Sequence, residues 1–551
     1  FGLVFEEHEE SIDKKLEKNS TVVSEEKELF INNGGDMNFL IEGDNLASLE
    51  LLTKTHREKI DLIYIDPPYN TGNKDFTYDD KIVEKDDGFK HSKWLSFMER
   101  RLKIANQLLT QKGIIVISIG YHELNYLVVL CEEMFINKQV VTVTVQTSGG
   151  KPSGGFNYLH EYLVFITPKD FQPNPVKFAG GNERSPFEGL TLSTFDKTQR
   201  PNQTYPIFID KKTNRIVGTG LSLDERIKDG SYIGEKADFP FDLDEAPDGT
   251  VALWPISSKG GECVWRLIST RLMDDWKKGY IKVSKNRTKN HPNKFSVQYL
   301  PEGVINKIDS GVLEVIGTED GAPTLVFGKN KTVGSDIPTI WTEKEFYTTK
   351  GTNLLKEILG PKKFSYPKPL EFIVEVIRAT SKPDSIILDF FAGSGTTGQA
   401  VLDLNKEDNG QRKFILCTNN EKNICREVTY ERLKRVNDIH DYNMSLKYFK
   451  VDFVEVENRF FYEYTDELLQ HVRELVELEN AIDFTSNKEI GIILTDEELE
   501  KFVQNFEQSK NCKVIYLGHD VLPNNQQETL FKKHKIKVNI IPDYYYREKR
   551  G

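Results

Sequence analysis

Blocks of apolar residues predict alternating strands and helices in the first part of the chain. The apolar run at 59–66 predicts a buried strand. From Lys93 onward, apolar residues recur at i, i+3 and i+4 spacing and predict an amphipathic helix, and the run 114–118 predicts the next strand. Because strand–helix–strand order with apolar strands indicates a parallel sheet covered on both faces, we expect a doubly wound α/β sheet.

The same alternation returns after about residue 350. Strands are predicted at 386–390 and 414–418, and helices at 396–404 and 421–436. Between the two parts the pattern changes to short strands and turns with little helical periodicity, which predicts an inserted, mostly β or mixed module. We therefore expect one α/β sheet that is written in two pieces around an insert.

These patterns divide the chain into four parts. The expected parts are the first half of the α/β domain (1–147), the insert (148–340), the second half of the α/β domain (341–442) and a C-terminal α/β extension (443–551). The helices expected in the extension carry an apolar stripe formed by Leu468, Val472, Leu475 and Leu478. Such a stripe must be buried against another surface.

Composition limits the class of protein. The chain has 551 residues, of which 38% are hydrophobic and 29% charged, so it can form cores and is not wholly disordered. Its apolar stretches are far shorter than the ~20 residues that cross a bilayer. The five cysteines form no CxxC pair, which argues against a disulfide framework or a zinc site. We expect a cytoplasmic protein without a metal and without a membrane partner.

The charge is distributed unevenly. The net charge of −12 argues mildly against a nucleic-acid partner. Residues 266–294, however, contain nine basic side chains and only two acidic ones, Asp274 and Asp275. This run is either a solvated surface or a surface that faces a polyanion, and the charge pattern alone leaves both interpretations open.

A glycine-rich turn follows the strand predicted at 386–390. The segment 389–398 reads Asp-Phe-Phe-Ala-Gly-Ser-Gly-Thr-Thr-Gly, in which glycines allow a ligand close to the backbone and the following helix N-terminus favours an anionic group. It lacks the third glycine of the dinucleotide fingerprint and the lysine of a P-loop. Glu421, after the next strand, is placed to bind ribose hydroxyls, with Asn420 as a competitor. The combination fits a nucleoside ligand without a pyrophosphate, such as S-adenosylmethionine (SAM).

A second motif, Asp66-Pro67-Pro68-Tyr69, ends the strand predicted at 59–66. A strand-ending turn would also use prolines and an aspartate. Two prolines fix the backbone, so the Asp66 carboxylate and the Pro67 carbonyl can accept both hydrogens of a planar exocyclic amine. Tyr69 offers a face on which a base can stack, worth roughly 1–3 kcal/mol. These groups suit methylation of an amino nitrogen on a base flipped out of its helix.

The two motifs resemble the signatures of the amino-methylating DNA methyltransferases. Their order, with Asp-Pro-Pro-Tyr first and Phe-x-Gly-x-Gly last, resembles the beta class, in which the methyltransferase sheet is written in permuted order. Further segments resemble the modification (Mod) subunit of type III restriction–modification systems, namely 43–46, 66–72, 94–98, 160–162, 364–369, 388–397 and 446–449. The resemblance covers nearly the whole chain to about residue 452 and is weak in the insert.

The resemblance implies roles for individual residues. Asp66, Pro67, Pro68 and Tyr69 would be catalytic. The SAM-binding residues would be Asp44, Asn45, Asp66, Lys368, Pro369, Asp389, Phe391, Ala392, Gly393, Ser394, Gly395, Thr396, Asn420 and Glu421. In this assignment Asp44 reaches the adenine amine of SAM, and Lys368 and Pro369 close the pocket near the methionine carboxylate. Asp44 would also suit a helix N-cap, and Lys368 would also suit a surface position.

These features predict a SAM-dependent DNA methyltransferase that acts on adenine N6 in double-stranded DNA. The insert would recognise the target sequence and contact DNA through Lys277, Lys278, Lys282, Lys285, Arg287 and Lys289. The alternatives are a cytosine-N4 enzyme, whose motif usually starts with Ser rather than Asp, a non-catalytic DNA-recognition subunit, and a protein or small-molecule methyltransferase. The resemblance further implies a homodimer, with the C-terminal extension contributing to subunit contacts or to docking of a restriction (nuclease–translocase) subunit.

Overall fold

The chain divides into two compact units, one formed by residues 1–180 and 336–551 and the other by residues 181–335. The structure is a computed structural model. It describes residues 2–72, 77–78, 81–84, 86–150, 155–176, 185–257, 259–286, 291–309, 313, 315–327, 337–361, 363–485, 487–506, 509 and 511–545.

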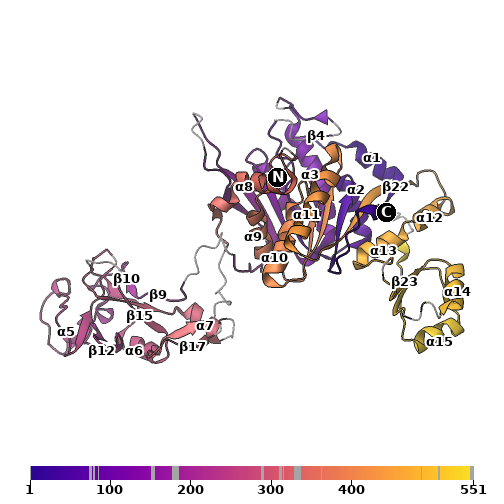
Figure 1. Ribbon diagram of the computed structural model, residues 1–551. Helices are drawn as coiled ribbons and strands as arrows, with labels where there is room; N and C mark the ends of the chain where they lie inside the picture. The colour runs from indigo at the N-terminus through magenta and orange to yellow at the C-terminus, as the bar shows by residue number, and fades with distance from the viewer. Residues whose placement is uncertain are drawn as a thin grey trace. The chain divides into compact units, whose positions relative to one another are not determined.

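A mixed sheet of ten strands forms the centre of the first unit. In spatial order the strands are β1 (Asn19–Glu25), β22 (Ser445–Glu455), β2 (Met37–Glu42), β21 (Lys413–Thr418), β20 (Ile386–Asp389), β3 (Ile60–Ile65), β6 (Leu109–Ile119), β8 (His160–Pro168), β7 (Lys138–Gln146) and β19 (Ile340–Trp341). The strands from β22 to β6 run parallel to one another, whereas β1 and β8 are antiparallel to their neighbours. Purple and orange segments, from the two halves of the chain, lie together in one α/β body (Figure 1).

Helices cover both faces of this sheet. Successive strand residues point to opposite faces, so Ile63 and Ile65 of β3 enter one core while Leu62 and Tyr64 enter the other. The first core contains side chains of α2 (Asn45–Thr55), α3 (Lys90–Leu108) and α4 (Leu124–Met134); the second contains side chains of α9 (Leu370–Thr380), α10 (Thr396–Asp408) and α11 (Glu431–His440). The expected doubly wound α/β sheet in permuted order is therefore confirmed.

The chain reverses its winding direction between β20 and β3. These two strands are parallel neighbours, but β20 is followed by its neighbour β21 on one side, and β3 is followed by its neighbour β6 on the other. Helices then leave the two strands toward opposite faces, and a crevice opens beyond their carboxyl ends. Asp389 ends β20, and Asp66 directly follows β3. The fold thus brings the two sequence motifs to one crevice.

Two part boundaries differ from those expected from the sequence. Strand β8 lies beyond residue 147 but pairs with β6 and β7, and β22 lies beyond residue 442 but pairs with β1 and β2. The strands belong to the sheet because their apolar side chains complete its two cores. The insert proper therefore begins after β8, and the sheet continues through Glu455.

The C-terminal region packs on its own chain. Leu468, Val472, Leu475 and Leu478, from α12 (Phe461–Leu469) and α13 (Val472–Asn480), are buried in the first core. The apolar stripe on which a subunit contact was expected is thus already covered. A small parallel sheet follows, formed by β23 (Ile490–Ile493), β24 (Val514–Leu517) and β25 (Lys537–Ile540), with α14 (Asp496–Gln504) and α15 (Asn525–Lys533).

The second unit is built mainly from short antiparallel strands. Its sheets are β12 (Ile216–Thr219), β11 (Ile207–Asp210) and β13 (Thr250–Leu253); β15 (Ile281–Lys285), β16 (Phe295–Tyr299) and β9 (Glu188–Gly189); β10 (Thr191–Leu192) and β14 (Val264–Trp265); and β17 (Val315–Thr318) and β18 (Leu325–Phe327). Short helices α5 (Leu223–Lys228), α6 (Ser269–Lys277) and α7 (Glu302–Asp309) accompany them. Trp265, Trp276 and Tyr205 contribute to its largest core. In the parts of the chain described here, no helix is long and apolar enough to cross a membrane.

Candidate active site

A cavity of about 780 Å³ lies at the crevice between β20 and β3. It is lined by most of the residues that the sequence singled out, namely Asp44, Asn45, Asp66, Pro67, Pro68, Tyr69, Lys368, Asp389, Phe391, Ala392, Gly393, Ser394, Thr396 and Glu421. Pro369, Gly395 and Asn420 are not among the lining residues. Pro369 is instead the N-cap of α9, and Gly395 is the N-cap of α10.

The glycine turn after β20 forms one wall of the cavity. Gly393 and Gly395 have φ values of 48° and 74°, in the left-handed region that glycine adopts without strain. A Cβ at Gly393 would also lie 3.1 Å from Cζ of Phe364. Asp389 braces the turn, since its carboxylate accepts hydrogen bonds from the Phe391 N–H at 2.9 Å and the Thr397 hydroxyl at 2.5 Å. Burial raises the pKa of Asp389 to about 7. The turn fits a ligand that approaches the backbone closely.

A buried arginine supports this turn from behind. Arg432 of α11 donates from Nη1 to the Thr396 hydroxyl at 2.7 Å and from Nε to Gln399 at 2.9 Å. Burial lowers the pKa of Arg432 to about 10. The sequence analysis missed this residue, because a lone arginine on a helix gives no signal of burial.

Asp44 and Asn45 meet at the start of α2. Asp44 caps the helix through Oδ1, which accepts from the N–H groups of Leu46 at 2.8 Å and Ala47 at 3.2 Å. Asn45 Oδ1 accepts from Nε of Arg101 at 2.6 Å. The N-cap interpretation of Asp44 is therefore correct, and the second carboxylate oxygen, Oδ2, forms an ion pair with Nη2 of Arg101 at 4.0 Å.

The guanidinium of Arg101 ties the N-terminal segment to the cavity. Arg101 is 1% exposed and forms a forked interaction with Glu10, at 2.7 and 3.2 Å. Burial raises the pKa of Glu10, and Arg101 opposes this shift. Glu10 and Arg101 both line the cavity, and neither was predicted from the sequence.

The segment after β21 presents Glu421 to the cavity. Glu421 is exposed and begins the short 3₁₀ turn η5 (Glu421–Asn423). The competing candidate, Asn420, accepts a hydrogen bond at 3.2 Å from the N–H of Arg426, in the first turn of the π-helix Ile424–Tyr430 that follows. Asn419 lines the cavity in its place.

The Asp-Pro-Pro-Tyr segment follows β3 and faces the glycine turn across the cavity. Nε1 of Trp94 donates to the Pro68 carbonyl at 2.7 Å and fixes the backbone of the segment. Tyr69 packs against Gly120, where a Cβ would lie 2.9 Å from Cδ2 of the ring. Oδ1 of Asp66 is buried and forms an ion pair with Lys368 at 3.1 Å, but it accepts no hydrogen bond from the described residues. A buried acceptor with unused hydrogen-bonding capacity suits a donor supplied by a ligand.

Lys368 lies beside Asp66 and Tyr69. Its Nζ is 3.1 Å from Oδ1 of Asp66 and 2.9 Å from Oε2 of Glu161 in β8, and it donates to the Tyr69 hydroxyl at 2.7 Å. The Tyr69 hydroxyl in turn donates to Glu161 at 2.8 Å. Burial raises the pKa of Asp66, and the neighbouring Lys368 opposes this shift. Glu161 lies in the segment 160–162, which resembles the Mod subunits, but the resemblance gives this residue no role.

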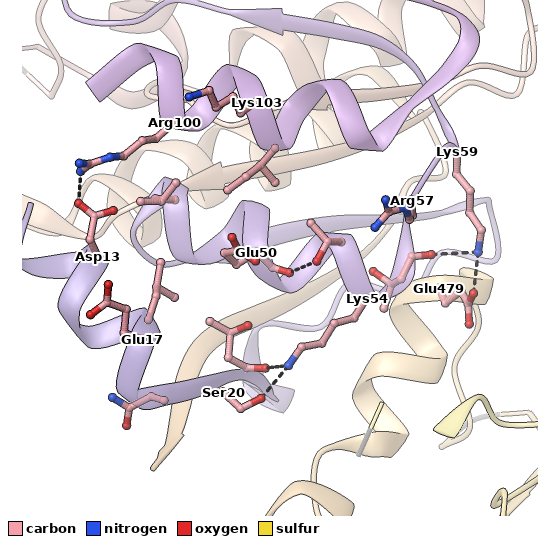
Figure 2. Close-up of a pocket in the computed structure, with 17 residues that line it drawn as sticks. Asp13, Glu17, Ser20, Glu50, Lys54, Arg57, Lys59, Arg100, Lys103 and Glu479 are labelled. Atoms are coloured by element: carbon pink, nitrogen blue, oxygen red, sulfur yellow. Dashed lines mark hydrogen bonds and ion pairs between the residues drawn. The ribbon is translucent and has the colours of Figure 1, made fainter. Parts of the chain in front are cut away.

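A second cavity, of about 730 Å³, lies among α1 (Ser11–Lys18), α2 and α3 and contains none of the predicted site residues. Figure 2 shows that several of its cations are engaged. Arg100 bonds Asp13, Lys59 pairs with Glu479 at 2.6 Å, and Lys54 donates to the Thr21 carbonyl at 2.6 Å. This mixture of paired charges indicates a structural role.

The basic residues expected to contact DNA lie in the second unit. Arg287 and Lys289 fall outside the described residues. Lys277 and Lys278 are exposed at the end of α6, and Lys285 is exposed at the end of β15. Lys282 forms an ion pair with Glu319 at 2.7 Å.

The chain is similar in sequence to known DNA methyltransferases. Residues 60–431 match the family described as DNA methylase (N6_N4_Mtase). Type II methyltransferase M.KpnI of Klebsiella pneumoniae is 30% identical over 441 residues, which cover 75% of this chain and 90% of that protein. The EcoPI Mod subunit of Escherichia phage P1 is 28% identical over 435 residues, which cover 71% of this chain and 58% of that subunit. The StyLTI Mod subunit of Salmonella typhimurium is 26% identical over 460 residues, which cover 76% of this chain and 60% of that subunit.

The chain therefore spans about six tenths of the length of these two Mod subunits. Among solved structures, the PvuII DNA methyltransferase (cytosine-N4-specific) aligns with a TM-score of 0.31 and 12% identity over 75% of this chain and 94% of that chain. The M1.HpyAVI–SAM complex aligns with a TM-score of 0.29 and 14% identity, over 73% of this chain and 99% of that chain. Because the family match covers more than half of the sequence, the chain belongs to the N6/N4 DNA methylase family, whose methyl donor is SAM.

Proposed function

We propose that the protein methylates adenine N6 in double-stranded DNA at a specific sequence. The observation that carries this proposal is the position of Asp66 and Tyr69 in the same cavity as the glycine turn after β20. One side of the cavity offers acceptors and an aromatic ring to a planar aminated base, and the other offers a close backbone approach to a nucleoside cofactor.

In this proposal the protein acts mainly through positioning and hydrogen bonds. SAM, when bound, supplies a methyl group already activated on a sulfonium. Tyr69 stacks on the flipped adenine, and the Asp66 carboxylate and the Pro67 carbonyl accept its two amine hydrogens. Accepting both hydrogens directs the nitrogen lone pair toward the methyl carbon. Asp44, Glu421 and the turn at 391–396 would hold the cofactor.

Cytosine N4 is the alternative target, since the same groups can hold its amine. The Asp at position 66 favours adenine. Methylation-sensitive long-read sequencing of DNA from cells that express the chain tests both the base and the recognised sequence. Methylated adenines at a recurring motif are the expected result, whereas N4-methylcytosine at such a motif would overturn the assignment of the base.

We propose that the second unit contacts DNA phosphates through its basic run. The clearest candidates are Lys278 and Lys285, which are exposed and form no ion pair with the described residues. Replacing both with alanine is expected to weaken DNA binding and to reduce the slope of log K against log salt by about 0.9 for each lost phosphate contact. Fluorescence anisotropy between about 50 and 200 mM salt measures the slope. The same double substitution at Lys211 and Lys212, two exposed lysines outside the run, is the control. An unchanged slope in the Lys278/Lys285 variant would mean that these residues are only solvated.

We further propose that the protein acts as a homodimer and as the modification component of a restriction system with a separate nuclease–translocase subunit. The support for both is the similarity to the EcoPI and StyLTI Mod subunits. The dimer contact must use a surface other than the stripe at 468–478, which is buried in the chain's own core. Light scattering at micromolar concentration determines the oligomeric state.

A further inference from the structure

The ammonium group of Lys368 lies between two carboxylates beside the Asp-Pro-Pro-Tyr segment. Its Nζ is 3.1 Å from Asp66, 2.9 Å from Glu161 and 2.7 Å from the Tyr69 hydroxyl. The ammonium donates hydrogen bonds to Glu161 and the Tyr69 hydroxyl, and the contact with Asp66 is an ion pair. Its charge is thus already engaged on this side of the cavity, away from the role beside a cofactor carboxylate that the resemblance suggested for it.

The three charged groups come from distant parts of the chain and are shielded from water. Asp66 follows β3, Glu161 lies in β8 and Lys368 precedes α9. The Lys368 side chain is 11% exposed, against 28% for Asp66 and 21% for Glu161. A cation this buried is costly unless it is paired, and the second carboxylate supplies the additional pairing. One ammonium thus serves two carboxylates.

We propose that Lys368 and Glu161 are positioning residues for methyl transfer, in which Lys368 keeps the Asp66 carboxylate ionised and oriented and Glu161 holds both Lys368 and the Tyr69 ring in place. This inference rests on the proposed function. It assigns Lys368 to the target-base side of the cavity and gives Glu161 a role in the reaction. Neither residue needs to touch the reacting atoms.

The charges around Asp66 explain why the lysine matters. The titratable groups that face it are Tyr64 of β3, Tyr69, Asp389 at the end of β20, Glu161 and Lys368. Among these described neighbours, Lys368 alone is a cation. Without it, two carboxylates would face each other in a largely buried site, and one of them would take up a proton near neutral pH. A protonated Asp66 is a weaker, uncharged acceptor for its amine hydrogen, so the transfer step would slow.

Removing the lysine charge should therefore move the pH dependence of the reaction. In Lys368→Met the acid limb of the single-turnover rate is expected to shift upward by at least about one pH unit, because an opposite charge at this distance lowers a carboxyl pKa by about 1–3 units. Lys368→Arg keeps the charge and should stay close to the wild-type profile. Removing Glu161's charge as well, in Lys368→Met/Glu161→Gln, should return part of the shift, since the like charge beside Asp66 is also gone.

The experiment compares the full chain with these variants in two assays. Calorimetry gives the affinity for SAM, and tritiated-methyl transfer to duplex DNA across about pH 5.5 to 9 gives the rate profile. Lys363→Met is the matched control, because Lys363 is exposed, pairs with Glu427 at 3.4 Å and does not line the cavity. We expect SAM affinity within about threefold of wild type in every variant. Urea unfolding checks that each variant is folded. If Lys368→Met does not fold, the rate profiles of Lys368→Arg and Glu161→Gln still test the proposal.

Three results would overturn the inference. A loss of SAM affinity of about tenfold or more in Lys368→Met would assign the lysine to the cofactor. An unchanged acid limb, or no recovery in the double variant, would make the cluster merely structural. Failure of the proposed function looks different: methylated cytosine, or no transfer by the wild type, would overturn the proposed reaction, while the SAM affinities still decide on which side Lys368 acts.

Discussion

Replacing Asp66 with alanine is expected to lower methyl transfer by about a hundredfold to ten-thousandfold while SAM affinity falls only a fewfold. The reason is that Oδ1 of Asp66, although paired with the Lys368 charge at 3.1 Å, is a buried acceptor with no hydrogen bond from the described residues, and in our proposal the target amine supplies that hydrogen bond. The glycine turn is braced by Asp389 and Arg432 rather than by Asp66, so the cofactor side of the cavity stays formed. Tritiated-methyl transfer under single-turnover conditions, with SAM affinity measured by calorimetry, separates the two effects.

Asp66→Asn provides the matched variant. It keeps the shape of the side chain and one carbonyl acceptor but removes the charge, so its rate should fall between those of the wild type and Asp66→Ala. The alanine variant should remain folded, since Lys368 keeps its ion pair with Glu161 at 2.9 Å. Transfer at the wild-type rate by the alanine variant would remove Asp66 from the reaction.

Lys447→Met is expected to destabilise the first unit by about 3–5 kcal/mol. Lys447 of β22 is 0% exposed and lies 2.6 Å from Glu477, 2.9 Å from Asp483 and 3.2 Å from Glu25. Burial alone would lower its pKa, but the hydrogen bonds to Glu477 and Asp483 and the charges of Glu477 and Glu25 together outweigh burial and raise it. Methionine leaves the three carboxylates buried without their cation, and the penalty for an uncompensated buried charge is large.

Urea unfolding followed by tryptophan fluorescence measures this loss. Lys450→Met, at an exposed position of the same strand, is the control and should change stability by less than about 0.5 kcal/mol. Equal midpoints for Lys447→Met and Lys450→Met would show that the carboxylates around Lys447 are not held as charges.

The sequence predicted the elements that carry the two motifs, but not how they continue. The run at 59–66 corresponds to β3 (Ile60–Ile65), and the helix expected at 396–404 to α10. The single helix expected at 421–436 is instead a 3₁₀ turn, a π-helix and then α11, because Lys422 and Asn423 adopt left-handed backbone angles. The spacing of apolar residues predicts where a helix lies, but it does not show where two polar residues break the helix.

For the candidate site, the sequence identified the residues that stand in motifs and missed those that approach from elsewhere. Asp66, Tyr69, Gly393 and Asp389 are recognisable because each follows a predicted strand. Glu161 reaches the cavity only because β8 inserts antiparallel between β6 and β7, which is a pairing that local pattern cannot reveal. Roles tied to long-range pairing therefore need the structure.

The interleaved strand order also determines when the first unit can fold during synthesis. The N–H of Ile386, at the start of β20, donates to Asp61 of β3, 325 residues earlier in the chain, and β2 pairs with β21 and β22 from the second half. Until those later strands leave the ribosome, β2 and β3 present unpaired apolar edges, which invite aggregation. The strand pairs described in the second unit all lie within 181–335, so this unit can fold earlier. Nascent chains that end before β20 should therefore depend on chaperones that shield exposed strands.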